Sequence, residues 1–201
     1  MLNTQDIYDL NLEVSLNDEQ CGQIEEFVKK RFGDAKHYSE NRNAYYTKIE
    51  DDLRVGAIGE FLTFNGLIQL GFEFKEPPDM THYSIRNKNW KADLIGVEKE
   101  QEYNLHVKAT RGFRGQSTWT FNLKDKGKES GMDPLLTTSE GDLNNYLSLV
   151  HVTSNTSGKI MVIGQWHTFK KYLKDPILAD KKGLKICLYY PFDKMEKWSG
   201  K

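Results

Sequence analysis

The chain contains 201 residues, of which 38% are hydrophobic, 28% are charged and 12% are aromatic. This length fits one domain, and 4 Trp, 10 Tyr and 10 Phe exclude an intrinsically disordered chain. No apolar stretch approaches the ~20 residues that a transmembrane helix requires, so no membrane partner is expected. The first residues lack the basic and apolar parts of a signal peptide, and Cys21 and Cys187 lie far apart. We therefore expect a reduced, cytoplasmic protein.

Basic residues concentrate in one segment, although the formal net charge of the chain is only -1. Residues 105–128 contain six basic side chains and a single acidic one, Asp125. A basic strip on a nearly neutral protein is what a surface that binds nucleic-acid phosphates would need, although a solvated lysine-rich loop has the same composition. The candidate nucleic-acid-binding residues are Arg111, Arg114, Gln116, Lys124 and Lys126.

Two helices are expected in the first third of the chain. Residues 18–33 follow Asn17, a typical N-cap residue, and they begin with acidic and end with basic side chains. Residues 50–70 repeat apolar side chains at steps of three and four and stop at Gly71. Gly56 and Gly59 interrupt this second helix at a cost of ~1 kcal/mol each, which indicates close packing against another backbone. Glu60 then lies on or beside the closely packed face.

Strand patterns dominate the rest of the chain. Strands are expected at residues 72–74, 90–97, 103–110, 117–123, 146–152, 159–166 and 185–190, and a short helix at 168–173. Residues 127–145 have no period and read as a loop. The sequence therefore predicts a single α+β domain over residues 1–201, with a mixed sheet of five to seven strands. Residues 1–48 are expected to form a helical N-terminal extension.

Polar side chains collect on two strands that are expected to pair as a hairpin. A polar connection of hairpin length separates residues 90–97 from 103–110, which places Asp93 across from His106 and Lys108. Because side chains alternate along a strand, His106 and Lys108 share one face, while Leu105 and Val107 share the other. An acid, an imidazole and an ammonium group on an apolar sheet need to pair or to bind a cation.

Three motifs resemble those of the PD-(D/E)XK, or restriction-endonuclease-like, nuclease superfamily. They are the segment VGAIGE at residues 55–60, the strand start Ala92-Asp93 and the triplet His106-Val107-Lys108, which occur in the family's order within residues 50–165. The resemblance implies a restriction-endonuclease-like, α/β/α-like core with a mixed sheet flanked by helices. It also implies that Asp93 and Glu60 bind Mg2+ or Mn2+, and that Lys108 orients the attacking water or the phosphate.

Two positions depart from the family's pattern. Ala92 replaces a frequent proline, which is structural, whereas His106 replaces the usual Glu or Asp. Because Mg2+ prefers oxygen ligands, an imidazole is a poor substitute. Glu60 can supply the second oxygen ligand from the helix, His106 can hydrogen-bond or deprotonate the attacking water, or His106 marks an inactive site. The sequence also shows no helix pattern between the Lys108 and Tyr146 strands, where the family usually has one.

Other polar residues are interpreted as structural. Asp79 follows Pro78 as a literal Pro-Asp, but it stands in a Pro-Pro turn with no strand after it. Asp52 is read as a residue of the first helical turn that favours the dipole. His151 and His167 have no partner at zinc-ligand spacing, so no zinc site is expected.

The expected function is a divalent-metal-dependent endonuclease that hydrolyses phosphodiester bonds of DNA, of the restriction, phage or repair type. Its catalytic residues would be Asp93, His106, Lys108 and Glu60, and its metal ligands Asp93, Glu60 and His106. A duplex substrate would call for a homodimer, one chain for each strand. The alternative is a catalytically degenerate protein of the same fold that binds nucleic acid or acts as an inhibitor.

Overall fold

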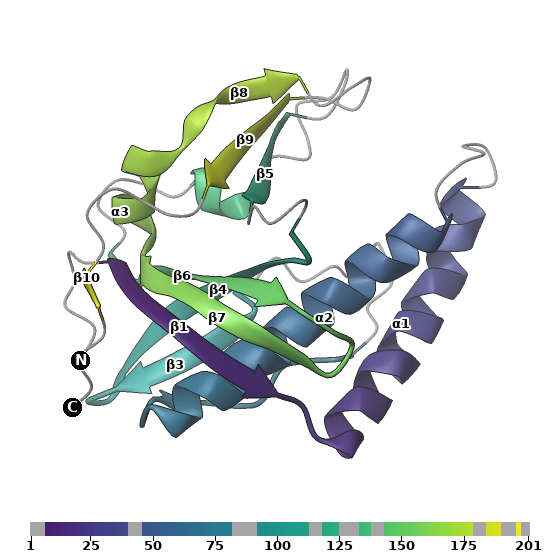
Figure 1. Ribbon diagram of the computed structural model, residues 1–201, viewed down its shortest axis with the longest axis horizontal. Coiled ribbons are helices and arrows are strands. Elements are labelled where there is room, and N and C mark those ends of the chain that lie inside the picture. The colour runs from purple at the N-terminus through teal and green to yellow at the C-terminus, as the bar shows by residue number, and fades with distance from the viewer. Residues whose placement is uncertain are drawn as a thin grey trace.

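The computed structural model describes residues 7–39, 46–81, 92–112, 118–124, 133–137, 143–178, 184–189 and 196–197 (Figure 1). Its helices are α1 (Asp18–Ser39), α2 (Tyr46–Gln69), α3 (Trp166–Phe169) and the 3-10 turns η2 (Pro134–Thr137) and η3 (Lys170–Tyr172). Its strands are β1 (Ile7–Ser15), β2 (Glu73–Phe74), β3 (Leu94–Glu98), β4 (Gln101–Thr110), β5 (Thr118–Lys124), β6 (Asn145–Val152), β7 (Ser157–Gln165), β8 (Lys174–Leu178), β9 (Leu184–Tyr189) and β10 (Glu196–Lys197).

The strands form a seven-stranded mixed sheet and a separate three-stranded sheet. The strand order of the large sheet is β10-β1-β7-β6-β4-β3-β2, and that of the small sheet is β5-β9-β8. In the large sheet β4 pairs with β6 in parallel, whereas β3 and β4 form the expected antiparallel hairpin. Lys99 and Glu100 join this hairpin with φ values of 48° and 67°, as a two-residue turn with two positive φ angles requires. The predicted α+β class is therefore confirmed.

Both long helices lie on one side of the large sheet (Figure 1). Asn17 and Gln20 form a reciprocal capping box at the start of α1, with hydrogen bonds of 2.8 and 3.1 Å. Gln20 also exchanges hydrogen bonds with Asn65, which ties α1 to α2. α2 ends at Gln69, and Gly71 follows in the turn after it, where its φ of 86° suits glycine. The two helices, β1 and the sheet enclose a core that contains Ile24, Val28, Ile58, Leu62 and Ile160.

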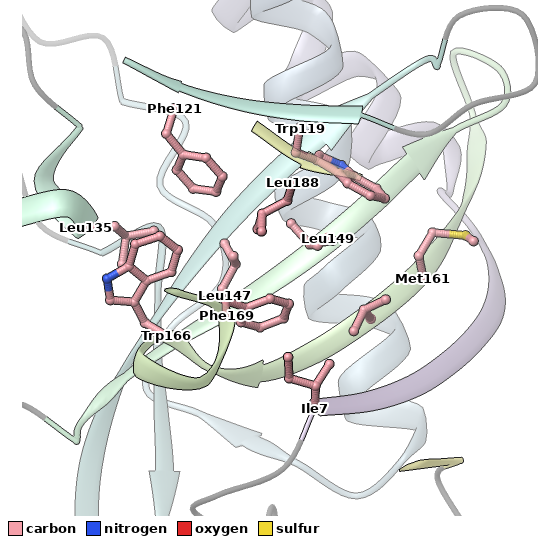
Figure 2. Packing of buried hydrophobic residues seen from close by; sticks show 11 residues of the cluster. Ile7, Trp119, Phe121, Leu135, Leu147, Leu149, Met161, Trp166, Phe169 and Leu188 are labelled. Carbon is pink, nitrogen blue, oxygen red and sulfur yellow. The ribbon is translucent and has the colours of Figure 1, made fainter. Parts of the chain in front are cut away.

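The small sheet covers the opposite face. Figure 2 shows Trp119 and Phe121 reaching from β5 toward Leu147 and Leu149 of β6, with Trp166 and Phe169 of α3 beside them. Trp119 donates a hydrogen bond from Nε1 to the carbonyl of Val150, at 3.1 Å. This second face therefore packs against strands and the four-residue α3, rather than against the helix layer that an α/β/α arrangement implies.

Two further expectations need correction. The sequence predicts a helical extension over residues 1–48, but residues 7–15 form β1, an inner strand between β7 and β10. β8 also had no counterpart among the predicted strands. Among the described residues, no helix is both long and apolar enough to cross a lipid bilayer.

Candidate active site

The β3–β4 hairpin fixes which predicted site residues share a face. Leu94 pairs with Leu105, a register that sets Asp93, just before β3, opposite His106. Val107 and Ala109 pack against the core beneath α2. The ammonium of Lys108 instead lies over the ring of Phe121, 5.2 Å from its centroid, on the side of the small sheet. The structure thus confirms that the side chain of Lys108 lies on the opposite face from Val107.

Asp93 is held at the edge between β3 and β4. Its Oδ2 accepts a hydrogen bond from the backbone N–H of Val107, at 2.7 Å, so the carboxylate takes over a bond of the ladder just before β3 begins. Burial raises the pKa of Asp93 above its usual value, and the hydrogen bond from Val107 and the charges of His106 and Lys108 oppose that rise. The carboxylate is therefore partly desolvated and within electrostatic reach of both predicted partners.

Glu60 approaches the same place from α2. The preceding Gly59 packs so closely on β4 that a Cβ there would overlap the Cβ of Ala109. Burial raises the pKa of Glu60 well above its usual value, and the nearby Asp93 carboxylate raises it further. Arg31 of α1 opposes this rise, while Asp79 adds to it. The charge of Asp93 therefore acts on Glu60, the other carboxylate of the predicted site.

Lys108 has a partner that no sequence motif indicates. Its ammonium forms an ion pair with Asp133, and the two side chains are 29% and 10% exposed. The other carboxylate oxygen of Asp133 accepts the backbone N–H of Leu135, at 3.2 Å, at the start of η2. Asp133 lies in the segment that we expected to be a plain loop, and its charge also raises the pKa of Asp93.

His106 contacts the neighbouring parallel strand. Its Nε2 lies 3.3 Å from Oδ1 of Asn145, and Nδ2 of Asn104 donates to that same oxygen at 3.3 Å. Asn104 and Asn145 are register partners in the β4–β6 pair. Asn145 is buried, with 4% of its surface exposed.

A cleft of about 540 Å3 opens next to this site. Its walls are the first half of α2, the end of β4 and the start of β5, and Lys108 and Arg111 are its basic lining residues. Asp51 and Asp52 also line it, so Asp52 lies in the cleft rather than merely at a helix end. Glu60 and Asp93 are not among the lining residues of this cleft. At Gly56 nothing lies within 4 Å of the Cβ position, and the close approach predicted there is wrong.

Arg111 is bound within the protein. Its guanidinium lies 3.1 Å from Oδ1 of Asp51 and 2.7 Å from Oδ1 of Asn155. Nε2 of His151 donates to the carbonyl of Arg111 at 2.8 Å. The other candidate nucleic-acid-binding residues, namely Arg114, Gln116, Lys126 and the side chain of Lys124, lie outside the described residues.

The donor atoms at this site suit a hard cation. Glu60 and Asp93 offer carboxylate oxygens, the ligands that Mg2+ and Mn2+ prefer. Within the part of the chain that the structure describes, no group of three or more His, Cys, Asp or Glu side chains is arranged to hold a metal ion. Of the three predicted metal ligands, Asp93 and Glu60 are carboxylates. The imidazole of the third, His106, contacts Asn145 instead.

Comparison with known proteins adds no relative: no family model, curated protein or solved structure matches the chain.

Three residues of the site escaped sequence reasoning. Asp79 has a signal in the literal Pro78-Asp79, which we set aside because no strand follows it. Asp133 and Asn145 carry no motif, because the path of the chain after β4 and the parallel β4–β6 pairing bring them to the hairpin.

Proposed function

We propose that the chain is a divalent-metal-dependent endodeoxyribonuclease similar to the PD-(D/E)XK nucleases. The observation that carries the proposal is that the Asp93 carboxylate acts electrostatically on Glu60 of α2 and is itself within electrostatic reach of Lys108 and His106. Burial raises the pKa of both carboxyl groups, and the charge of Asp93 raises that of Glu60 further, so the two are costly to keep ionised together. A bound divalent cation would remove that cost, so we infer that the two carboxylates serve as cation ligands.

The mixed sheet supports a restriction-endonuclease-like core. α2 packs across β4 and carries Glu60, while the β3–β4 hairpin carries Asp93, His106 and Lys108. A bound cation would supply an acidified water and a positive charge near the scissile phosphate. Asp93 and Glu60 would hold it through their oxygens. Lys108 would place its ammonium against the phosphate, where fixed positive charge stabilises the transition state.

The cleft gives the substrate a path. Lys108 and Arg111 line it, and their charges suit a phosphate backbone. Because Arg111 pairs with Asp51, an incoming phosphate would exchange one anionic partner for another at this guanidinium. With one such site in each chain, cutting both strands of a duplex would take two chains.

A second candidate is a protein of the same fold that binds nucleic acid, or inhibits another protein, without catalysis. The ion pairs favour it, because Lys108 and Arg111 are each neutralised by an aspartate of the same chain. The imidazole at position 106, where the nucleases have an acid, also favours this non-catalytic candidate.

Cleavage of supercoiled plasmid DNA separates the two candidates. We expect cleavage with Mg2+ or Mn2+, and a loss of at least about a hundredfold in Asp93→Asn and in Lys108→Met. His106→Glu should raise the Mg2+-dependent rate, because it adds an oxygen ligand. Glu26→Gln, on the exposed side of α1, should cleave like the wild type.

Cleavage that survives both Asp93→Asn and Lys108→Met would refute the site. A wild-type chain that binds DNA but cuts it with neither metal would instead establish the non-catalytic candidate.

A further inference from the structure

The chemical role of His106 depends on which of its ring nitrogens carries the proton. A neutral imidazole has one N–H donor and one bare nitrogen, and only the bare nitrogen can bind a cation or accept a proton from water. The sequence leaves the role of His106 open. The hydrogen bonds around the ring indicate which of its two nitrogens carries the proton.

Nε2 of His106 faces an atom that can only accept. Oδ1 of Asn145 lies 3.3 Å from Nε2, and an amide oxygen has no hydrogen to donate. Nε2 must therefore be the protonated nitrogen for this contact to be a hydrogen bond. In the neutral ring, Nδ1 is then the nitrogen with the free lone pair.

The amide of Asn145 is held in this orientation by its neighbour. Nδ2 of Asn104 donates to the same Oδ1 at 3.3 Å, so reversing the Asn145 amide alone would set two NH2 groups against each other. The parallel register pairs Asn104 with Asn145 and sets His106 opposite Leu147. Burial of Asn145, at 4% exposure, keeps bulk water from replacing these bonds.

The ring lies between two different neighbours of β4. β6, with Asn145, flanks β4 on one side, and β3, with Asp93 directly before it, flanks β4 on the other. The bond to Asn145 thus engages Nε2 on the side away from the candidate cation site.

We propose that Asn145 is a positioning residue that keeps the proton of His106 on Nε2 and so leaves Nδ1 bare for the chemistry of the site. The role of Nδ1 in hydrolysis rests on the proposed function, but the position of the proton does not. Partners of this kind, which orient a reactive imidazole from behind, typically change metal affinity or activity 10- to 100-fold when removed.

The proton can be located by 15N NMR of the full-length labelled chain, without metal or nucleic acid, in alkaline solution where imidazoles are neutral. The chain has 5 histidines, and the ring signals of His106 are those lost in His106→Gln. We expect a proton on Nε2 and a bare Nδ1 in the wild type. In Asn145→Leu, which has no acceptor, we expect the Nε2 proton to exchange with water at least about tenfold faster.

Asn145→Asp keeps the acceptor oxygen and is the matched variant. It should retain the proton on Nε2 and, because a charged acceptor binds more strongly, move the resonance of that proton downfield. This variant also carries the test if Asn145→Leu does not fold.

A wild-type ring with its proton on Nδ1, or on both nitrogens, would overturn the proposal. So would unchanged exchange in a folded Asn145→Leu, or an unshifted Nε2 proton in Asn145→Asp. Because the sample holds neither metal nor DNA, these outcomes do not depend on whether the chain cleaves DNA. If the cleavage assay fails, the NMR experiment still locates the proton on His106.

Discussion

Glu60 shows how a single side chain links the stability of this fold to its proposed chemistry. Burial and the Asp93 carboxylate raise its pKa well above the ordinary value of 4.5. A raised pKa means that the folded state binds the proton more tightly than the unfolded chain does. The group therefore favours folding below about pH 4.5, and this contribution is lost as the pH rises through the higher pKa of the folded state.

Replacing Glu60 with glutamine should stabilise the protein at neutral and alkaline pH. Glu60→Gln removes a buried charge beside Asp93, so the free energy of unfolding at about pH 8 should rise by on the order of 1 kcal/mol. The fall in stability between about pH 5 and about pH 8 should also become shallower. Urea unfolding at the two pH values measures both effects.

Glu26→Gln is the control for this change. Glu26 pairs with Lys30 on the exposed surface of α1, at 2.5 Å, so its removal should change little at either pH. A Glu60→Gln protein that is less stable than the wild type at about pH 8 would show that the glutamate is held as a well-paired anion, contrary to our account.

Individual site residues differed in how far sequence could predict them. Asp93, Lys108 and Glu60 stand in local strand and helix patterns, and in the structure the charge of Asp93 acts on Glu60 while that of Lys108 acts on Asp93. Asp133 and Asn145 reach the site only through non-local contacts, the ion pair to Lys108 and the parallel β4–β6 pairing. A periodicity within one segment holds no information about such contacts.

At the scale of elements, α2 provides a matched pair of glycines. A Cβ at Gly59 would overlap Ala109 on β4, whereas at Gly56 nothing lies within 4 Å. Gly59→Ala should therefore destabilise the protein by about 1–3 kcal/mol, because α2 must move away from the sheet. Gly56→Ala should stabilise it by about 0.5–1 kcal/mol, because alanine loses less backbone entropy in a helix.

Thermal or urea unfolding of the two variants checks this prediction. Equal effects of the two substitutions would contradict the packing of α2 on β4. The sequence predicts close approach at both glycines, because the cost of glycine in a helix is visible from sequence while the neighbour that justifies it is not.

The helices and hairpins were predictable because their signals are local. The cap at Asn17, the stop at Gly71 and the β3–β4 turn all lie within a few residues of the elements that they bound. β1 also carries a local strand signal, the alternating Leu10, Leu12 and Val14. A bulge between Asp9 and Leu12, with Asn11 at a φ of 45°, interrupts its regular pairing.

At the scale of the whole molecule, β1 joins the N-terminal segment to the main sheet. It pairs with β7 along most of its length, and Ile7, Tyr8 and Val14 are buried. Removing residues 1–15 should cost about 5 kcal/mol or more, because three large apolar side chains leave the core, and it should expose an edge of β7. Urea unfolding followed by circular dichroism measures the loss.

Glu13→Gln is the control for the truncation, since Glu13 is 68% exposed in its pair with Lys159 and should matter little. A truncated chain that unfolds with the stability of the full chain would show that residues 1–15 are separable from the fold after all.

The most direct test of the account is Mn2+ binding followed by electron paramagnetic resonance of the full-length protein. We predict one bound Mn2+ per chain, with affinity reduced at least about tenfold in Asp93→Asn and in Glu60→Gln and unchanged in Glu26→Gln. Because Glu60→Gln should be the more stable protein at neutral pH, its loss of Mn2+ could not be attributed to unfolding. A wild-type chain that binds no Mn2+, or variants that bind it as tightly as the wild type, would contradict the claim that Glu60 and Asp93 form a cation site.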